Sequence, residues 1–369
     1  MFSKIVSFEL KYWLKSPLLY VYAIIMAVIS MFIMASAIGV FDDSTVTVTG
    51  ISKINSAKGI TGLLTAMALL VYFLLPSIVG SSIYKDYKHE MYQVLFAYPF
   101  SKLSYLLGKF VSSFLMVLVV ILFCMFGLWI GTQLPGANQE LLLDFKLLNY
   151  LQPFLLIVIP NLIFFGAIVF GVVTFSRNIF VGFITVVILI VLQSLANSYM
   201  QDLDTKIIAA LLDPTGMSAV ALETEYWTVA EENSKLIPFE NYILYNRLLW
   251  LGISSVLFTA IFSLFKFHQQ PVSLNLFKKK GNRVTKRNFG DSSQTKMPSF
   301  KVDFSFLNQL KIAWKHSFIE LKYILKNWAF ISIAVVAILI TWLVLEVGMP
   351  IQGTDTLPVT RNVIMLAKG

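Results

Sequence analysis

Long runs of apolar residues alternate with shorter polar segments along the chain. A helix rises about 1.5 Å per residue, so about 20 apolar residues cross the roughly 30 Å hydrocarbon core of a bilayer. Seven runs come near this length, and the fifth is the shortest. They are residues 18–38, 63–82, 110–130, 154–175, 179–195, 248–265 and 328–345. The pattern predicts an all-α membrane protein, a polytopic bundle of helices.

The polar segment before the first run has a helical periodicity of its own. Lys4, Lys11 and Lys15 fall on one face of residues 1–16, and apolar side chains cover the other face. Such a helix lies in the headgroup plane and keeps its lysines in the polar layer. Pro17 ends it, because proline lacks the N–H that a helix interior requires.

A second amphipathic segment lies between the second and third runs, at residues 84–109. Within it, residues 84–98 show apolar side chains at helical spacing on one side, which predicts a surface helix. Pro99 breaks that helix, and Ser101 is a candidate N-cap for the next one. This corner is either a handle that another protein can push or a linker that touches only lipid headgroups.

Composition strengthens the membrane prediction. The 369 residues are 57% hydrophobic and only 13% charged, about half the charged fraction of a soluble protein. The single cysteine, Cys124, lies in an apolar run, so we expect no disulfide framework and no thiolate metal cluster. The sequence GxxxxGK[ST], which cradles nucleotide phosphates, does not occur. His89-Glu90 resembles the start of a zinc-protease HExxH motif, but Gln93 stands where the second histidine is needed, so we expect no metal site.

The lysines and arginines give an orientation. If the N-terminus is cytoplasmic, 21 of the 29 basic residues fall on the cytoplasmic side and 8 on the other. The basic residues behind the net charge of +9 thus follow the predicted topology, and we expect no nucleic-acid partner. Residues 84–98 and a basic linker at 268–305 are predicted to be cytoplasmic, the linker held near anionic lipid.

The largest segment predicted on the outer side, 197–246, is acidic. Residues 213–216, Asp-Pro-Thr-Gly, predict a turn, and the apolar residues on both sides suggest short helices that dip into the outer leaflet. The carboxylates could bind a cation. We favour the alternative, a solvated acidic loop that is not translocated.

An internal repeat organises the chain. Residues 8–15 and 319–326 are identical at six of eight positions, at an offset of 311. The lysines of the first copy recur in the second as Lys315, Lys322 and Lys326. Each copy is a basic amphipathic helix that leads into an apolar run. The repeat predicts a first half at 1–267, the linker at 268–305, and the start of a second half at 306–369.

The end of the chain extends this comparison. Residues 57–59, which lead into the second run, resemble residues 367–369. The chain therefore stops where an eighth span would begin. One interpretation is a fragment of a protein with two six-span halves, and the other is a natural outer tail after one unpaired span.

These features together resemble the permeases of type-2 ABC exporters. The resemblance covers a cytoplasmic elbow helix, six spans per half, a coupling helix between spans two and three, and re-entrant helices before span six. The motif of an acidic helix, a proline, Ser-Lys and Leu-Leu-Gly-Lys is matched by Asp86, Glu90, Pro99, residues 101–102 and residues 106–109. The Gly-Thr that often follows the acidic residue is replaced here by Met91-Tyr92.

The resemblance implies where a partner would bind. The implied contacts with a cytoplasmic ABC ATPase are Asp86, Tyr87, Glu90, Met91, Val94 and Pro99. The implied interface of the elbow helices is made by Lys4, Lys11, Lys15, Lys315, Lys322 and Lys326.

A narrower resemblance is to permeases, frequent in Bacteroidetes-like bacteria, that are fused to a metallopeptidase similar to aminopeptidase N. It depends on residues 212–214, 226–231 and 246–252. Such a peptidase would lie beyond Gly369, so no catalytic residue is expected in this chain.

The resemblance implies a multi-pass permease subunit of an ATP-driven exporter in the bacterial inner membrane. ATP would be bound by the partner, and this chain would be neither an enzyme nor the holder of a cofactor. Its partners would be the ATPase, the bilayer, and a second permease half or a second permease. Two alternatives stay open: an anchor for a downstream metallopeptidase, and a membrane assembly factor that transports nothing.

Overall fold

The computed structural model describes residues 2–41, 52–98, 101–199, 206–267 and 305–325. The described residues form helices joined by turns and loops, and no strand occurs among them. The chain divides into two units, Met1–Val272 and Ser273–Gly369. The predicted seventh span, residues 328–345, lies outside the described residues.

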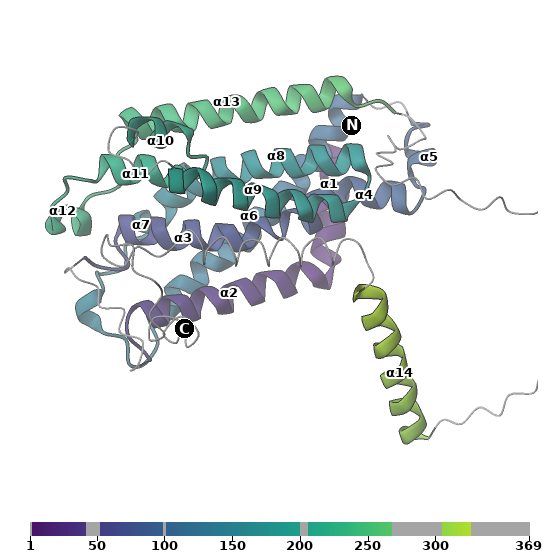
Figure 1. Cartoon of the computed structure of the whole chain (residues 1–369), viewed down its shortest axis with the longest axis horizontal. Coiled ribbons are helices and arrows are strands. Elements are labelled where there is room, and N and C mark those ends of the chain that lie inside the picture. The colour runs from purple at the N-terminus through teal and green to yellow at the C-terminus, as the bar shows by residue number, and fades with distance from the viewer. Residues whose placement is uncertain (1, 42–51, 99–100, 200–205, 268–304, 326–369) are drawn as a thin grey trace, which may run out of the picture. The chain divides into compact units, whose positions relative to one another are not determined.

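The first unit contains thirteen α-helices among its described residues (Figure 1). They are α1 (Phe2–Lys15), α2 (Pro17–Ala37), α3 (Ala57–Tyr72), α4 (Ser81–Lys88), α5 (Tyr92–Leu95), α6 (Lys102–Gly131), α7 (Leu147–Pro153), α8 (Ile159–Ser176), α9 (Ile179–Tyr199), α10 (Lys206–Leu212), α11 (Met217–Glu223), α12 (Val229–Ser234) and α13 (Asn241–Leu264). Two short π-helical turns, η1 (Pro76–Gly80) and η3 (Phe154–Val158), and a 3₁₀ turn, η2 (Gln139–Leu141), complete it.

The long helices run side by side, and the short ones gather at the two ends of the bundle (Figure 1). The α1 end carries α1, α4 and α5, and the α10 end carries α7, α10, α11 and α12. Helix α2 packs along α6, and α13 packs along α8. A Cβ added at Gly127 of α6 would overlap the Ala27 carbonyl of α2, so this glycine allows the close approach.

Four helical segments are long and apolar enough to cross a membrane. They are Pro17–Ala37, Lys102–Gly131, Leu147–Ser176 and Asn241–Leu264. They contain the predicted runs at 110–130 and 154–175, and all but the last residue of the runs at 18–38 and 248–265. The predicted fifth span, residues 179–195, lies in α9.

The second predicted span is not one straight helix. The helix Ala57–Tyr72 and the helical segment Pro76–Lys88 are bent by 45° where they meet, and with the bend counted as one span the total is five. The bend falls just before Pro76, which cannot donate the N–H that a continuous helix needs. The segment continues to Lys88, beyond the predicted end at residue 82.

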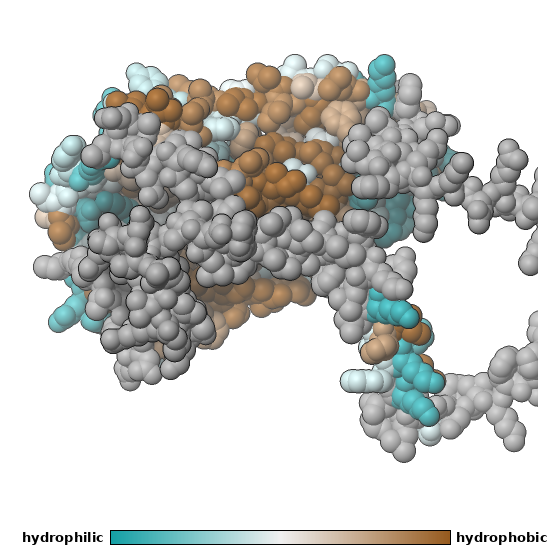
Figure 2. Space-filling model, viewed as in Figure 1, coloured by the Kyte–Doolittle hydropathy of each residue, from teal (hydrophilic) through white to brown (hydrophobic). Residues whose placement is uncertain are grey.

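Apolar side chains cover the middle of the visible face of the bundle, and hydrophilic residues lie toward the two ends (Figure 2). On α2, Ile24, Ile25 and Phe32 are exposed, and on α13 the same is true of Leu248 and Val256. Apolar surface of this extent favours a hydrocarbon environment. Several helices of this chain could therefore be held in a membrane.

Local signals explain several helix boundaries. As predicted, the first helix ends before Pro17, which starts α2. The Ser101 hydroxyl accepts a hydrogen bond from the Ser104 amide at 3.2 Å, which confirms the predicted N-cap of α6. Residues 213–216 form the predicted turn between α10 and α11, with Gly216 at a φ of +74°.

The second unit is described only by residue Ser305 and by α14 (Phe306–Leu325). The helix contains most of the second copy of the repeat. Lys315 and Lys322 are exposed on it, and Lys326 lies outside the described residues.

Candidate functional site

The amphipathic helix α1 has one charged residue on its buried face. Glu9 is 1% exposed and Trp13 is 3% exposed, whereas Lys4, Lys11 and Lys15 are exposed. The buried face packs against α6, where Gly108 leaves room for Ile5. The helix is therefore docked on the bundle through a face that places a carboxylate inside it.

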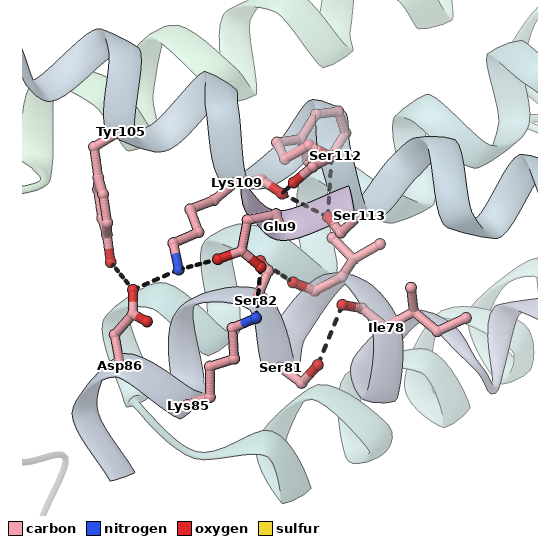
Figure 3. Close-up of polar contacts among 12 residues, drawn as sticks. Glu9, Ile78, Ser81, Ser82, Lys85, Asp86, Tyr105, Lys109, Ser112 and Ser113 are labelled. Atoms are coloured by element: carbon pink, nitrogen blue, oxygen red, sulfur yellow. Dashed lines mark hydrogen bonds and ion pairs between the residues drawn. The ribbon is translucent and has the colours of Figure 1, made fainter. Parts of the chain in front are cut away.

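Two lysines from different helices hold that carboxylate (Figure 3). The Lys85 Nζ of α4 lies 2.5 Å from Glu9 Oε2, and the Lys109 Nζ of α6 lies 2.7 Å from Glu9 Oε1. Lys109 also contacts Asp86 Oδ2 at 2.7 Å. The Tyr105 hydroxyl donates a hydrogen bond to the same Asp86 oxygen at 2.8 Å. We call Glu9, Lys85, Asp86, Tyr105 and Lys109 the ionic network.

The ionic network balances its charge. Two carboxylates face two ammonium groups, and Asp86 and Lys109 are as deeply buried as the apolar core around them. Buried ions are tolerated when they are paired and hydrogen-bonded, and removing one partner is costly because the other charge stays buried. The network therefore fixes α1, α4 and α6 to one another at the α1 end.

Beside this network the chain turns sharply. Helix α4 ends at Lys88, and Glu90 adopts a left-handed conformation with a φ of +55°. The structure thus corrects the prediction of one helix over 84–98, because the left-handed Glu90 stops the helix before the middle of that range. Residues 89–98, which we call the α5 corner, contain the single turn α5 and project from the end of α4.

Aromatic contacts attach the α5 corner to the bundle. The ring of Tyr92 stacks on Tyr87 of α4 at 5.3 Å between centroids, and Phe96 meets Tyr105 of α6 edge-on at 5.9 Å. The Arg177 guanidinium, at the turn between α8 and α9, lies 4.1 Å from the Tyr87 ring centroid. A force on the corner would thus reach α4, α6 and the α8–α9 turn.

The outer surface of the α5 corner carries large exposed apolar side chains. Met91 is 50% exposed, Val94 57% and Tyr98 63%. A hollow of about 440 Å³ opens between the corner and α1, and its lining includes Phe8, Met91 and Leu95. Large exposed side chains next to a hollow are typical of a surface that binds another protein.

The residues predicted to contact an ATPase divide into two groups. Glu90, Met91 and Val94 are exposed at the corner. Asp86 faces inward and is engaged by Lys109 and Tyr105, and Tyr87 is half-buried under Arg177. Pro99 lies outside the described residues.

Sequence reasoning missed the role of Glu9 and Lys109. The sequence shows Lys109 only as the last residue of the 106–109 motif, whereas in the structure it is 4% exposed and pairs with Glu9 and Asp86. A signal for Glu9 was present, because it is the single acidic residue of a basic helix and recurs in the repeat as Glu320.

At the α10 end several acidic residues pair with lysines. Glu232 pairs with Lys58 at 2.7 Å, and Glu231 pairs with Lys235 at 2.7 Å. Hydrogen bonds from Lys235 and from Thr228 lower the pKa of Glu231 to about 2. Among the described residues, no group of three or more His, Cys, Asp or Glu side chains is arranged to hold a metal ion.

Comparison of the sequence with protein-family models and with curated proteins gave no match. The site is therefore interpreted from its own geometry.

Proposed function

We propose that this chain is the membrane subunit of an ATP-driven transporter, a permease of the type-2 ABC exporter kind. The observation that carries the proposal is the ionic network directly beside the exposed α5 corner. Exposed apolar side chains that a partner could contact lie next to buried ion pairs that join α1, α4 and α6.

In this proposal a separate cytoplasmic ATPase docks on the α5 corner. Met91, Val94 and Tyr98 supply apolar contact area, and the hollow beside α1 receives a side chain of the partner. Glu90, exposed at the tip, meets a basic group of the ATPase. ATP is bound by the partner, and this chain supplies the route for the substrate.

The ionic network would transmit the movement of the ATPase. Because Glu9, Lys85 and Lys109 join three helices, the α1 end would move as a rigid body rather than deform. The contact between Arg177 and Tyr87 adds the α8–α9 turn to that body. Rigid-body rocking of a bundle around a fixed path is the general logic of alternating access.

The remaining parts of the proposal concern placement. The subunit lies in the inner membrane of a bacterium with its N-terminus in the cytoplasm, as the distribution of lysine and arginine favours. Helix α14, with its copy of the repeat, begins a second half that completes the transport path with the first, or else two permeases pair.

The test is native mass spectrometry of the complex purified through an N-terminal tag on the natural gene product. We expect an associated subunit whose peptides contain a GxxxxGK[ST] phosphate loop. A complex without any nucleotide-binding subunit would contradict the proposal. Zinc and peptide hydrolysis in that complex would favour a peptidase anchor, and their absence an assembly factor.

A further inference from the structure

At the α10 end, two segments far apart in sequence meet in a buried polar cluster. One is the 213–216 turn between α10 and α11, and the other is the pair Asn246 and Arg247 near the start of α13. Asn246 is 0% exposed and Arg247 is 2% exposed. A third member, Asn161 of α8, is equally buried. The cluster thus joins the α10–α11 hairpin (residues 206–223) to two long helices.

Asn246 binds the end of α10. Its side-chain amide donates to the carbonyl oxygens of Ala210 at 2.6 Å, Leu211 at 3.1 Å and Asp213 at 2.8 Å. The last carbonyls of a helix have no partner within it, so one amide from α13 satisfies groups that would otherwise be exposed or unpaired. The Trp250 indole N–H adds a bond to the Leu211 carbonyl at 3.2 Å.

Arg247 and Asn161 bind the turn itself. Arg247 Nη1 donates to Asn161 Oδ1 at 2.8 Å, and Nη2 donates to the Pro214 carbonyl at 3.4 Å. The Asn161 amide donates to the Thr215 carbonyl at 3.0 Å. Gly216 permits this arrangement, because a Cβ there would overlap the Arg247 guanidinium.

The guanidinium is held by neutral oxygens. Among the ion pairs of the described residues none includes Arg247, and the Asp213 carboxylate accepts instead from Thr215 and Ser218. The Asp213 charge attracts the guanidinium without forming an ion pair with it, so the buried cation loses its hydration and gains only part of what a direct pair would return. Water would restore that hydration if the hairpin lifted. The hydrogen bonds that close the cluster are thus opposed by a hydration energy that favours opening.

We propose that Asn161, Asn246 and Arg247 form a latch that holds the α10–α11 hairpin on α8 and α13. Release of the latch opens the α10 end of the bundle. The latch goes beyond the proposed function, and its test requires no ATPase and no substrate.

The experiment measures how fast a hydrophilic maleimide labels a buried cysteine in the purified full chain. Cys124 is first replaced by Ser. A reporter cysteine is then placed at Ala219 of α11 or at Ser113 of α6, both 0% exposed. The latch variant is Arg247→Gln. The control is Lys206→Gln, which breaks the surface pair between Lys206 and Glu225 on the same hairpin.

We expect Arg247→Gln to raise the labelling rate at Ala219→Cys by about tenfold or more, because charge-assisted hydrogen bonds hold the closed form. Labelling at Ser113→Cys should not change, and Lys206→Gln should leave both rates unaltered. Unchanged labelling at both reporters would overturn the latch. An equal rise at both would also overturn it, because the whole bundle would then have loosened. If Arg247→Gln does not fold, Asn161→Leu is measured in its place, and the same labelling results support or overturn the latch.

Discussion

The Glu9 carboxylate accepts from two lysines that come from different helices, and apolar side chains pack around the ionic network. In an isolated α1 this carboxylate would stay in water, because no other helix would cover it. The carboxylate therefore serves the assembly of three helices, while Lys4, Lys11 and Lys15 stay exposed on the opposite face of α1.

Replacing Glu9 with Gln should destabilise the chain. Lys85 would lose its carboxylate partner and Lys109 one of two, and removing one member of a buried pair costs up to about 3–5 kcal/mol. We expect a clear fall in the apparent melting temperature in detergent. Lys11→Gln, an exposed change on the same helix, should have no effect. Equal melting temperatures for the two variants would show that the network is not stabilising.

Glu90 allows a test of the partner contact alone. It is exposed and makes the left-handed corner, so Glu90→Asn removes the charge and keeps a residue that tolerates this conformation. We expect Glu90→Asn to reduce the amount of ATPase that copurifies, and Glu90→Arg to reduce it further by reversing the charge. Gln93→Arg, which adds a charge at a nearby exposed residue, is the control. If both Glu90 variants copurify as much ATPase as the unmodified chain does, this contact is excluded.

At the scale of elements, periodicity and proline predicted most helices but not the corner. The pattern of residues 84–98 continues through Glu90, where no glycine marks a stop. The left-handed turn at Glu90 is instead held by tertiary contacts, such as Tyr92 on Tyr87 and Phe96 on Tyr105. The pairing of Asp86 with Lys109 could not be predicted from the sequence either, because an ion pair between two helices leaves no local signal.

The close packing of α2 on α6 predicts that a larger side chain is tolerated less well at Gly127 than at Gly62. A side chain at Gly127 would overlap the Ala27 backbone, whereas one at Gly62 of α3 would meet no atom within 4 Å. Gly127→Val should therefore destabilise the chain by about 1–3 kcal/mol more than Gly62→Val, by overpacking. Thermal unfolding in detergent measures the difference. Indistinguishable unfolding would mean that α2 and α6 are not in this close contact.

At the scale of the molecule, the first unit has different devices at its two ends. The α1 end is fixed by the ionic network and presents an apolar corner. The α10 end is closed by hydrogen bonds that Asn246 and the buried Arg247 donate to neutral oxygens. In the proposed transport subunit, the bundle would be rigid where the ATPase pushes and would open at the opposite end.

The central claim is that an ATPase docks on the α5 corner, and cross-linking tests it most directly. A photo-reactive amino acid at Val94, 57% exposed, is activated in native membranes, with one at Tyr226, 89% exposed near the α10 end, as the control. The account predicts that Val94 forms a covalent product with a subunit that contains a nucleotide phosphate loop, and that Tyr226 does not. Failure of Val94 to cross-link to any nucleotide-binding subunit, in membranes where such a subunit copurifies with the chain, would contradict the claim.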